Sequence, residues 1–452
     1  MSLKLFIGLA LQVIAILLIL FRVRRRRLAY TGILFVSMSV VYHGLSELFQ
    51  IAFPGMNFYR TLVSQDKIDS WVLIFGLAIL TFAVTYCYRL RPLSTSELET
   101  PPQLTLGLVN WLWGILSVVL LQLMVAGSFG RFDLGYWGSL VTDTLPALTV
   151  LVLAEFIYKM RGRYLLLALI FQIGLGVLSG SRMLTLISAV VLLSVLFRCG
   201  VPIRWRSLFL PGIIAVFLVV SISGMRSIVG RDAFSEQTNM QRIESLFAGT
   251  GAVMRDGFAP EILEDFVYRF DANAFNGLVT AGYEAGVKPA GWTPVLNNFF
   301  LAVPSFLNPT KLEGGLFKLS EESYLVDHFN MPFFYTSLLT GELTGATIDY
   351  TAGTWGILFG AFGTAGLLLI AVLMGWGFAA ADSWIVRSRS LLAVLAGIWL
   401  TYATIMIEQG VAIYVLTGRA VLALFFVFMV LRQARALAAG SCRRAPTFCS
   451  LE

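Results

Sequence analysis

Charged residues are scarce in this 452-residue chain. Asp, Glu, Lys and Arg make up only 13% of it, whereas hydrophobic residues make up 58%. A soluble domain has about 25% charged and about 45–50% apolar residues. The mean hydropathy of +0.80 therefore excludes an ordinary soluble protein, and the same composition excludes intrinsic disorder. At about 20 apolar residues per crossing, the length allows on the order of ten transmembrane helices and one sizeable region outside the membrane.

Cysteine and histidine are also rare, with four and two copies. Four cysteines are too few for a disulfide-stapled secreted domain. Two distant histidines and no clustered cysteines argue against a zinc site. The chain also lacks a Walker A pattern, and it lacks the Asp-x-Asp pair with which many enzymes bind a divalent ion and a nucleotide sugar. We therefore expect neither a metal nor a cofactor.

Long apolar runs are abundant, and they predict an all-α polytopic membrane protein with about eleven transmembrane helices. Most runs have Lys or Arg at one end only. The charges of the first run follow it, and no small-residue cleavage site comes after, so we interpret it as a retained helix and not as a signal peptide. The predicted helices are residues 3–21, 28–52, 70–88, 105–126, 145–160, 164–180, 183–198, 207–225, 355–380, 390–408 and 411–431.

The positive charges predict the orientation, because short cytoplasmic loops are enriched in Lys and Arg. Nineteen of the 33 Lys and Arg residues lie in short segments on one side, and the short loops of the other side hold only Arg60, Lys67 and Arg131. This asymmetry predicts an external N-terminus and a cytoplasmic C-terminus. All four cysteines then lie at the cytoplasmic face, where thiols stay reduced. The net charge of +7 reflects this topology and not a nucleic-acid partner.

The predicted helices divide the chain into four parts. Residues 1–225 hold eight helices, 226–350 form one large external segment, 351–435 hold the last three helices, and 436–452 form a cytoplasmic tail. Within the external segment, apolar residues at helical spacing predict a helix from Pro260 to Val279. The apolar piece from Val295 to Phe306 is too short to span a bilayer, so we expect it to be partly buried or re-entrant.

Two arginines near the membrane are candidate catalytic residues. Arg419 lies eight residues into the final predicted helix, where a cation should face the bundle interior and have a partner. The alternative is a structural pair with an acid on another helix. Arg182 follows Leu178-Ser179-Gly180-Ser181, a tight turn or helix break whose backbone amides could face a ligand. The alternative is an interfacial arginine that extends to the lipid headgroups.

Three further arginines lie in the external segment and are candidate substrate contacts. Arg226 and Arg231 flank the exit of the eighth predicted helix, where headgroup anchoring is the alternative. Arg269 comes four residues after Asp265, and an ion pair between these two is its alternative. His328 is a candidate general base because its reference pKa lies near neutrality, although a surface histidine is the commoner case.

Arginine in this external, membrane-proximal pattern suits a diphosphate ligand, because its planar fork donates bidentate hydrogen bonds and keeps its charge. An enzyme outside the cell membrane has no supply of ATP or nucleotide sugars. A substrate that is already activated as a lipid diphosphate meets both conditions.

The chain also resembles the repeat-unit polymerases of bacterial O-antigen and exopolysaccharide synthesis, the Wzy type. The resemblance covers the layout of most of the chain, with one large external loop before the last three spans. The motifs that carry it are Leu178-Ser179-Gly180-Ser181-Arg182, Tyr268-Arg269-Phe270, Val303-Pro304-Ser305-Phe306-Leu307-Asn308-Pro309-Thr310-Lys311, Thr340-Gly341-Glu342-Leu343 and Trp355-Gly356-Ile357-Leu358-Phe359-Gly360.

This resemblance implies the helical membrane fold of O-antigen ligases, related to other lipid-dependent (GT-C-like) glycosyltransferases. It implies an enzyme at the periplasmic face of the bacterial inner membrane that joins glycans carried on undecaprenyl diphosphate. Arg182 and Arg269 become diphosphate contacts, and no metal is required. A chain-length regulator and a flippase of the same pathway are expected partners.

Three other functions fit the same sequence. An O-antigen ligase would transfer glycan from the same carrier to a lipid A core. A transporter or flippase would move a lipid-linked glycan, although such proteins often have related halves, and none are found in this chain. An accessory subunit of a polysaccharide-synthesis complex would have no activity of its own.

Overall fold

The computed structural model is entirely helical over the part of the chain that it describes. No strand occurs among those residues, which confirms the predicted all-α class. The described residues are 2–26, 30–52, 58–90, 135–160, 162–178, 189–196, 271–302, 321–331, 352–388 and 390–444, together with the isolated positions 209, 210, 213, 241, 244, 245 and 251.

Five helices are long and apolar enough to cross a membrane, which supports a membrane-embedded protein. They match the first three and the ninth and eleventh of the predicted spans. The five candidate spans are Leu3–Arg22, Thr31–Ala52, Gln65–Arg89, Gly353–Arg387 and Ala412–Val430.

The other six predicted spans are not among these five. Residues 390–408 form α19 (Leu391–Ile405), a shorter apolar helix. Residues 145–160 belong to α7 (Gly135–Lys159), and residues 164–180 correspond to α8 (Leu165–Leu178). Of 183–198, the described part 189–196 is helical. The predicted span 105–126, and 207–225 apart from three single positions, lie outside the described residues.

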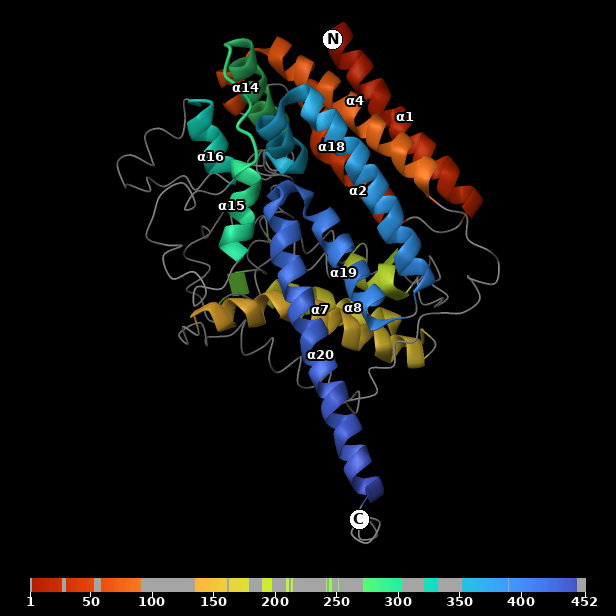
Figure 1. Cartoon of the computed structure of the whole chain (residues 1–452). Helices are drawn as coiled ribbons and strands as arrows, with labels where there is room; N and C mark the ends of the chain where they lie inside the picture. Colours follow the sequence, from red (N-terminus) through yellow and green to blue (C-terminus); the bar gives the residue numbers. More distant parts are fainter. Residues whose placement is uncertain are drawn as a thin grey trace.

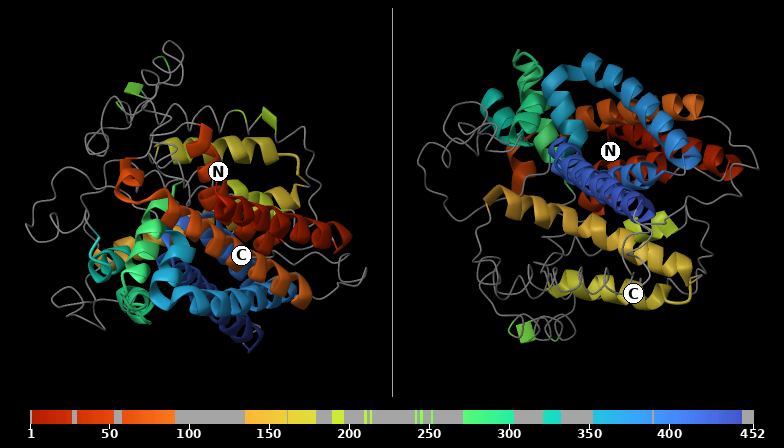
Figure 2. Two further views of the ribbon diagram at one scale, coloured as in Figure 1. Left: turned by 90° about the horizontal axis from the view of Figure 1, so that it is seen from above. Right: turned by 60° about the horizontal axis from the view of Figure 1, so that its bottom comes forward.

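The N-terminal helices and α18 form one bundle (Figures 1 and 2). α1 (Leu3–Arg26) and α4 (Gln65–Arg89) run side by side in the same direction. Glycine allows their close approach, because a Cβ on Gly8 would lie 2.6 Å from the Val72 carbonyl oxygen. Small residues serve the same purpose in membrane helix pairs generally.

The helix between α1 and α4 contains one irregular turn. α2 (Tyr30–Val40) continues through the π-helical turn η1 (Val41–Leu45) into α3 (Ser46–Ala52). It packs against α4 and α18 through buried aromatic rings. The ring centroids of Phe35 and Phe82 are 4.7 Å apart, and those of Phe35 and Phe378 are 4.8 Å apart.

α18 (Gly353–Arg387) is broken ten residues after its start. Gly363 has φ 67° and ψ −172°, a conformation that is not helical and that is essentially restricted to glycine. The carbonyls left open by the break are satisfied from outside the helix. The Tyr283 hydroxyl lies 2.7 Å from the Phe359 oxygen, and the Gly291 amide donates to Ala361 at 2.7 Å.

Three short helices of the predicted external segment cover the end of the bundle at which α1, α4 and α18 begin. They are α14 (Asn273–Glu284), α15 (Thr293–Ala302) and α16 (Glu321–His328). We call this end the α14 end; the last described helix, α20 (Ala412–Arg444), runs to the opposite end (Figure 1). The helix predicted over 260–279 is not continuous, because residues 271 and 272 are not helical, and α14 continues past the predicted end to Glu284. Residues 260–270 lie outside the described part.

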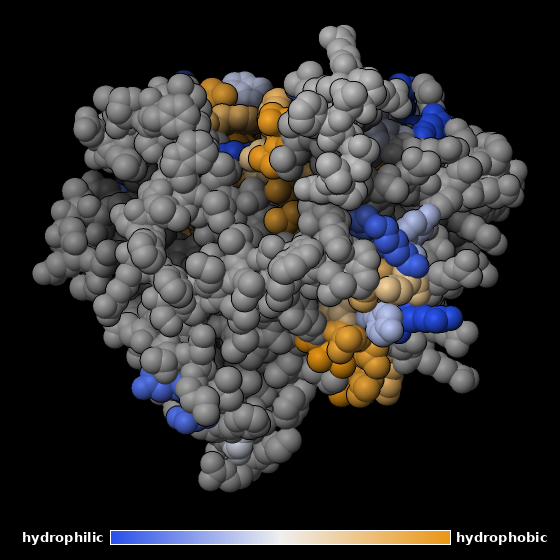
Figure 3. Space-filling view, turned by 90° about the horizontal axis from the view of Figure 1, so that it is seen from below, coloured by the Kyte–Doolittle hydropathy of each residue, from blue (hydrophilic) through white to orange (hydrophobic). Residues whose placement is uncertain are grey.

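A second group of helices has its own apolar core. α7, α8, residues 189–196, α19 and α20 (Ala412–Arg444) pack through buried leucine, isoleucine and valine side chains. α7 packs on α20 and runs across its direction (Figure 1). Many apolar side chains remain exposed on the outside of these helices, such as Leu422 at 53% and Phe426 at 64% in α20. Figure 3 shows a patch of exposed hydrophobic side chains, in orange, beside hydrophilic ones on the face seen from below.

Candidate functional site

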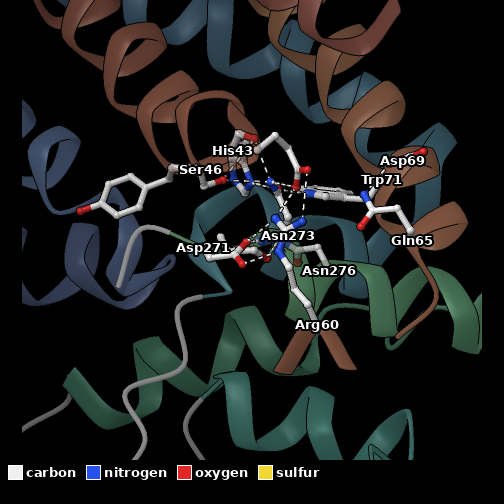
Figure 4. Close-up of polar contacts among 12 residues, drawn as sticks. His43, Ser46, Arg60, Gln65, Asp69, Trp71, Asp271, Asn273 and Asn276 are labelled. Carbon is white, nitrogen blue, oxygen red and sulfur yellow. Dashed lines mark hydrogen bonds and ion pairs between the residues drawn. The ribbon is translucent and has the colours of Figure 1, made fainter. Parts of the chain in front are cut away.

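A buried arginine lies between two carboxylates at the α14 end of the bundle (Figure 4). Arg60 belongs to the short 3-10 helix η2 (Phe58–Leu62). Its Nε and Nη2 donate to both oxygens of Asp271, at 2.7 and 3.0 Å. Its Nη1 donates to Glu47 at 3.2 Å, and Nη2 donates to the same carboxylate. The side chains of Arg60, Glu47 and Asp271 are 11%, 1% and 0% exposed.

Asn273, in the first turn of α14, connects this ion cluster to the bundle. Its Nδ2 donates to Glu47 and to the His43 carbonyl at 2.8 Å, and to Ser46 Oγ at 3.0 Å. Its Oδ1 accepts from Trp71 Nε1 at 3.0 Å and from His43 Nδ1 at 2.9 Å. One amide therefore joins α14 to two membrane helices that lie more than 200 residues earlier in the sequence.

The two carboxylates keep Arg60 charged and accept most of the hydrogen bonds that its guanidinium can donate. Burial lowers the pKa of Arg60, but the adjacent Asp271 and Glu47 carboxylates outweigh it and raise the pKa above its usual value. A guanidinium has five N–H groups, and four hydrogen bonds already go to the two carboxylates. Arg60 therefore acts as a clamp between η2, α3 and α14 and is not offered to an anionic ligand.

The irregular turn η1 places His43 inside this cluster. The ring is buried against Phe75, with centroids 4.2 Å apart, and its Nδ1 carries the proton donated to Asn273. His43 and Glu47 lie four residues apart in one helix, and both bond to Asn273, a partner that the helix itself does not contain.

A second buried carboxylate joins three elements at the same end. Glu321 begins α16 and is 3% exposed. It accepts from Asn298 Nδ2 of α15 and from the backbone amide of Ala412, the first residue of α20, at 3.2 Å. Burial raises the pKa of Glu321 to about 7, although the hydrogen bonds from Asn298, Ala412 and Val411 oppose the shift. The charge of this contact therefore changes near neutral pH.

The opposite end of the bundle holds a buried acid of a different kind. Asp382 of α18 is 2% exposed. It accepts from Tyr86 OH at 2.7 Å, from the Gly32 amide at 3.2 Å and from the Thr31 hydroxyl. These donors come from α2 and α4, so Asp382 connects three helices.

His328 takes a structural position in α16. Its Nε2 lies 2.8 Å from the Lys288 carbonyl oxygen and must donate to it, since that oxygen can only accept. The ring stacks on Tyr324 at an interplanar angle of 12°. These contacts hold α16 against the loop after α14. In the neutral ring they leave Nδ1 as the atom that can accept a proton.

Arg419 lies in α20, seven residues after Ala412, and is half-buried. His328 lies seven residues after Glu321 in α16. Glu321 and Ala412 form a contact between α16 and α20. His328 and Arg419 each lie seven residues beyond this contact, which is about 10 Å along the helix axis. From that contact α16 runs toward the loop after α14, whereas α20 runs toward the opposite end (Figure 1), so the structure does not bring the two together. The other predicted site residues lie outside the described part, namely Arg182, Arg226, Arg231 and Arg269.

No group of three or more His, Cys, Asp or Glu side chains within the described residues is placed to hold a metal ion. The buried cluster around Arg60 was also missed in the sequence. Its only local signal was that Arg60 is one of three cations in the short loops of its side. Arg60 and Asp271 are separated by 211 positions in the sequence, and no sequence pattern indicates that they form a pair.

Comparison with known proteins leaves the chain without a match, since no family model, no curated protein and no solved structure is similar to it.

Proposed function

We propose that this chain polymerises oligosaccharide repeat units carried on undecaprenyl diphosphate, by glycosyl transfer at the periplasmic face of the bacterial inner membrane. The proposal rests on the sequence motifs. Its main structural support is the layer of α14, α15 and α16, which packs with buried polar contacts over one end of an apolar helix bundle. In this proposal the α14 end, with the N-terminus, faces the periplasm, and the C-terminus is cytoplasmic.

The reaction would break the bond between the anomeric carbon of the growing glycan and its diphosphate oxygen. A hydroxyl of the second lipid-linked unit would form the new bond to that carbon, and undecaprenyl diphosphate would leave. Negative charge develops on the departing oxygen, and donors aimed at it stabilise the transition state more than the ground state. We assign this task to Arg182 and Arg419, with Arg226, Arg231 and Arg269 as further contacts to the diphosphate.

The acceptor hydroxyl must lose its proton as the new bond forms. His328 is the proposed base, and its bond to the Lys288 carbonyl specifies Nδ1 as the atom that would take the proton. Because the structure does not bring His328 to Arg419, a reaction that uses this base relies on Arg182 and not on Arg419 at the departing oxygen. Glu321 has a pKa near neutrality, but it is 3% exposed and engaged by Asn298 and Ala412. Arg60 is excluded as a diphosphate ligand because both carboxylates of its cluster occupy it.

The decisive test is incubation of the reconstituted protein with one undecaprenyl-diphosphate-linked repeat unit as the only substrate. A polymerase should produce a ladder of products, whereas a ligase should not extend the glycan without a lipid A core acceptor. Arg182→Ala should lower the rate about a hundredfold or more, as loss of one oxyanion donor does. Arg182→Lys should also lower it, because lysine lacks the planar fork.

Folded yield must be measured with activity for every arginine variant. Lys67→Ala is the matched control, since Lys67 is a cation at the same end that pairs with the half-exposed Glu284. Normal yield with lost polymer supports a diphosphate contact. Collapse of Arg419→Ala would assign that residue to the fold. Full-length polymer from both Arg182→Ala and Arg419→Ala would end the proposed mechanism.

A flippase or transporter is the second candidate, and the break in α18 favours it. Discontinuous membrane helices form the substrate sites of many transporters, and Gly363 interrupts α18 inside a candidate span. In the same vesicles a transporter would move the lipid-linked unit between leaflets without forming a new glycosidic bond. The product ladder therefore separates the two candidates.

A further inference from the structure

Helix α15 exposes large apolar side chains and buries two asparagines beside Val295. Trp292, just before the helix, and Leu296 and Phe299 within it are 63%, 45% and 54% exposed. Asn297 and Asn298 are buried, at 0% and 3%. A helix on the surface of a soluble protein buries its apolar stripe and exposes its amides.

The three exposed side chains follow the spacing i, i+4 and i+7 and therefore lie on one face of the helix. The opposite face binds the protein through polar contacts. Asn298 donates to Glu321, and that carboxylate accepts from the first amide of α20. Polar contacts inward and apolar groups outward are expected where the surroundings are hydrocarbon, because lipid cannot satisfy an amide.

The helices that pack against α15 also indicate hydrocarbon surroundings. α15 packs on α18 and α20, both of which contain candidate membrane spans, and Figure 1 shows it alongside the beginning of α20. Trp292 contacts Phe362 of α18, with ring centroids 4.7 Å apart. Farther along α18, Leu369 and Leu373 are exposed at 62% and 59%. The apolar face of α15 thus adjoins helices that carry their own exposed apolar side chains.

We propose that α15 is a half-length helix that enters the membrane beside α20 and presents Trp292, Leu296 and Phe299 to lipid acyl chains. Its ten residues extend about 15 Å, half of a bilayer core of about 30 Å. Trp292, at its start, matches the tryptophans that anchor proteins at the headgroup level. Three side chains are too small a surface for a stable dimer, which needs about 800 Å² per partner.

The test is the accessibility of nitroxide spin labels in the full chain, reconstituted in vesicles of phosphatidylethanolamine and phosphatidylglycerol. Labels are attached to Leu296→Cys and Phe299→Cys after replacing Cys199, Cys442 and Cys449 by serine. Cys87 is retained because it is buried at 7%. Leu369→Cys provides the lipid-facing control, and Asp327→Cys on the exposed side of α16 provides the water-facing control.

Labels at 296 and 299 should collide frequently with oxygen, which concentrates in lipid, and rarely with a water-soluble nickel chelate. They should thus behave like the label at 369. Frequent collisions with the chelate, as at 327, would place α15 in water and overturn the proposal. Protection from both reagents would also overturn it, because protein would then cover this face. The experiment does not depend on the proposed reaction.

Discussion

Both ends of the bundle of α2, α4 and α18 bury acidic side chains among membrane helices, but the partners of these acids differ. At the α14 end, Glu47 and Asp271 share the cation Arg60. At the opposite end, Asp382 is held by the neutral groups of Thr31, Gly32 and Tyr86. At the α14 end a cation joins the acids of two separate segments, whereas at the opposite end hydroxyl and amide donors of two bundle helices meet at an acid of a third.

The backbone conformation also differs between the two ends. The π turn η1 lies at the α14 end, and Gly353, Gly363 and Gly410 in the same region have positive φ. In the other direction, α18 continues without interruption from the break at Gly363 to Arg387. Irregular backbone and charged pairs therefore occur together, at the end that we propose to carry the function.

The largest expected effect is that of Arg60→Ala. Removal of one partner from a buried ion cluster leaves uncompensated charge and costs about 3–5 kcal/mol. We expect a strong loss of folded yield and a lower melting temperature in detergent. Lys67→Ala breaks a half-exposed ion pair at the same end and should change stability by about 0–1 kcal/mol. Equal melting temperatures for the two variants would show that Arg60 does not stabilise the fold as a clamp between η2, α3 and α14.

The next effect is a pH dependence of stability that comes from Glu321 at the α14 end. Because the pKa of Glu321 is raised from 4.5 to about 7, the folded protein binds more protons than the unfolded chain between these values. Stability should therefore fall as the pH rises from about 4.5 to about 7, by about 3 kcal/mol in total from this group. Thermal unfolding across this pH range measures it.

Glu321→Gln removes the titrating group and should flatten this slope. Glu284→Gln on the half-exposed side of α14 is the control and should leave the slope unchanged. A slope of the same size in wild type and Glu321→Gln would mean that another group titrates.

A smaller loss is expected from Asp382→Asn at the opposite end. The amide keeps one acceptor oxygen but points N–H groups at donors that Asp382 now satisfies, namely Tyr86 OH and the Gly32 amide. An unsatisfied buried donor costs about 1–3 kcal/mol, so we expect a loss of about 2 kcal/mol. If Asp382→Asn destabilised more than Arg60→Ala, the ion cluster of Arg60 would not be the stronger of the two buried contacts.

The smallest effects compare two glycines of α18. Gly363→Ala forces a Cβ into a conformation with φ 67° and ψ −172° and should cost about 1–2 kcal/mol. Gly377→Ala lies in regular helix with open space around the Cβ, so it should be neutral or stabilise by up to about 1 kcal/mol. Melting temperatures of both variants test the break directly; a stabilised Gly363→Ala would show that α18 runs straight.

The sequence predicted the helices of the bundle well, because a long apolar run bounded by arginine is a local signal. The run ending at Arg89 and the run after Trp355 are both helical as expected. The start of α14 was missed, since residues 260–279 have helical spacing throughout. The break at Gly363 was missed as well, because its carbonyl partners come from Tyr283, Ala290 and Gly291, distant in sequence.

The candidate site was less predictable than the fold. An arginine in a short loop is ambiguous between headgroup, ligand and buried acid, and only the tertiary structure identifies the acids of Arg60. The amide of Asn273 carries no charge and stands in no motif, yet it accepts or donates in five contacts with the bundle. Polar pairing across 200 residues depends on the packing of whole helices and leaves no local pattern.

The π turn at Val41–Leu45 has a consequence for the length of its helix. A π turn holds one residue more than the α turn it replaces. Deletion of one residue within it would therefore allow a continuous α-helix from Tyr30 to Ala52, with Glu47 still on the side of Asn273. Deletion of a residue in the regular part of α2 would instead rotate every side chain beyond it by about 100° and turn Glu47 away from Asn273. The chain should therefore tolerate loss of one residue inside the π turn more readily than loss of one residue between Tyr30 and Val40.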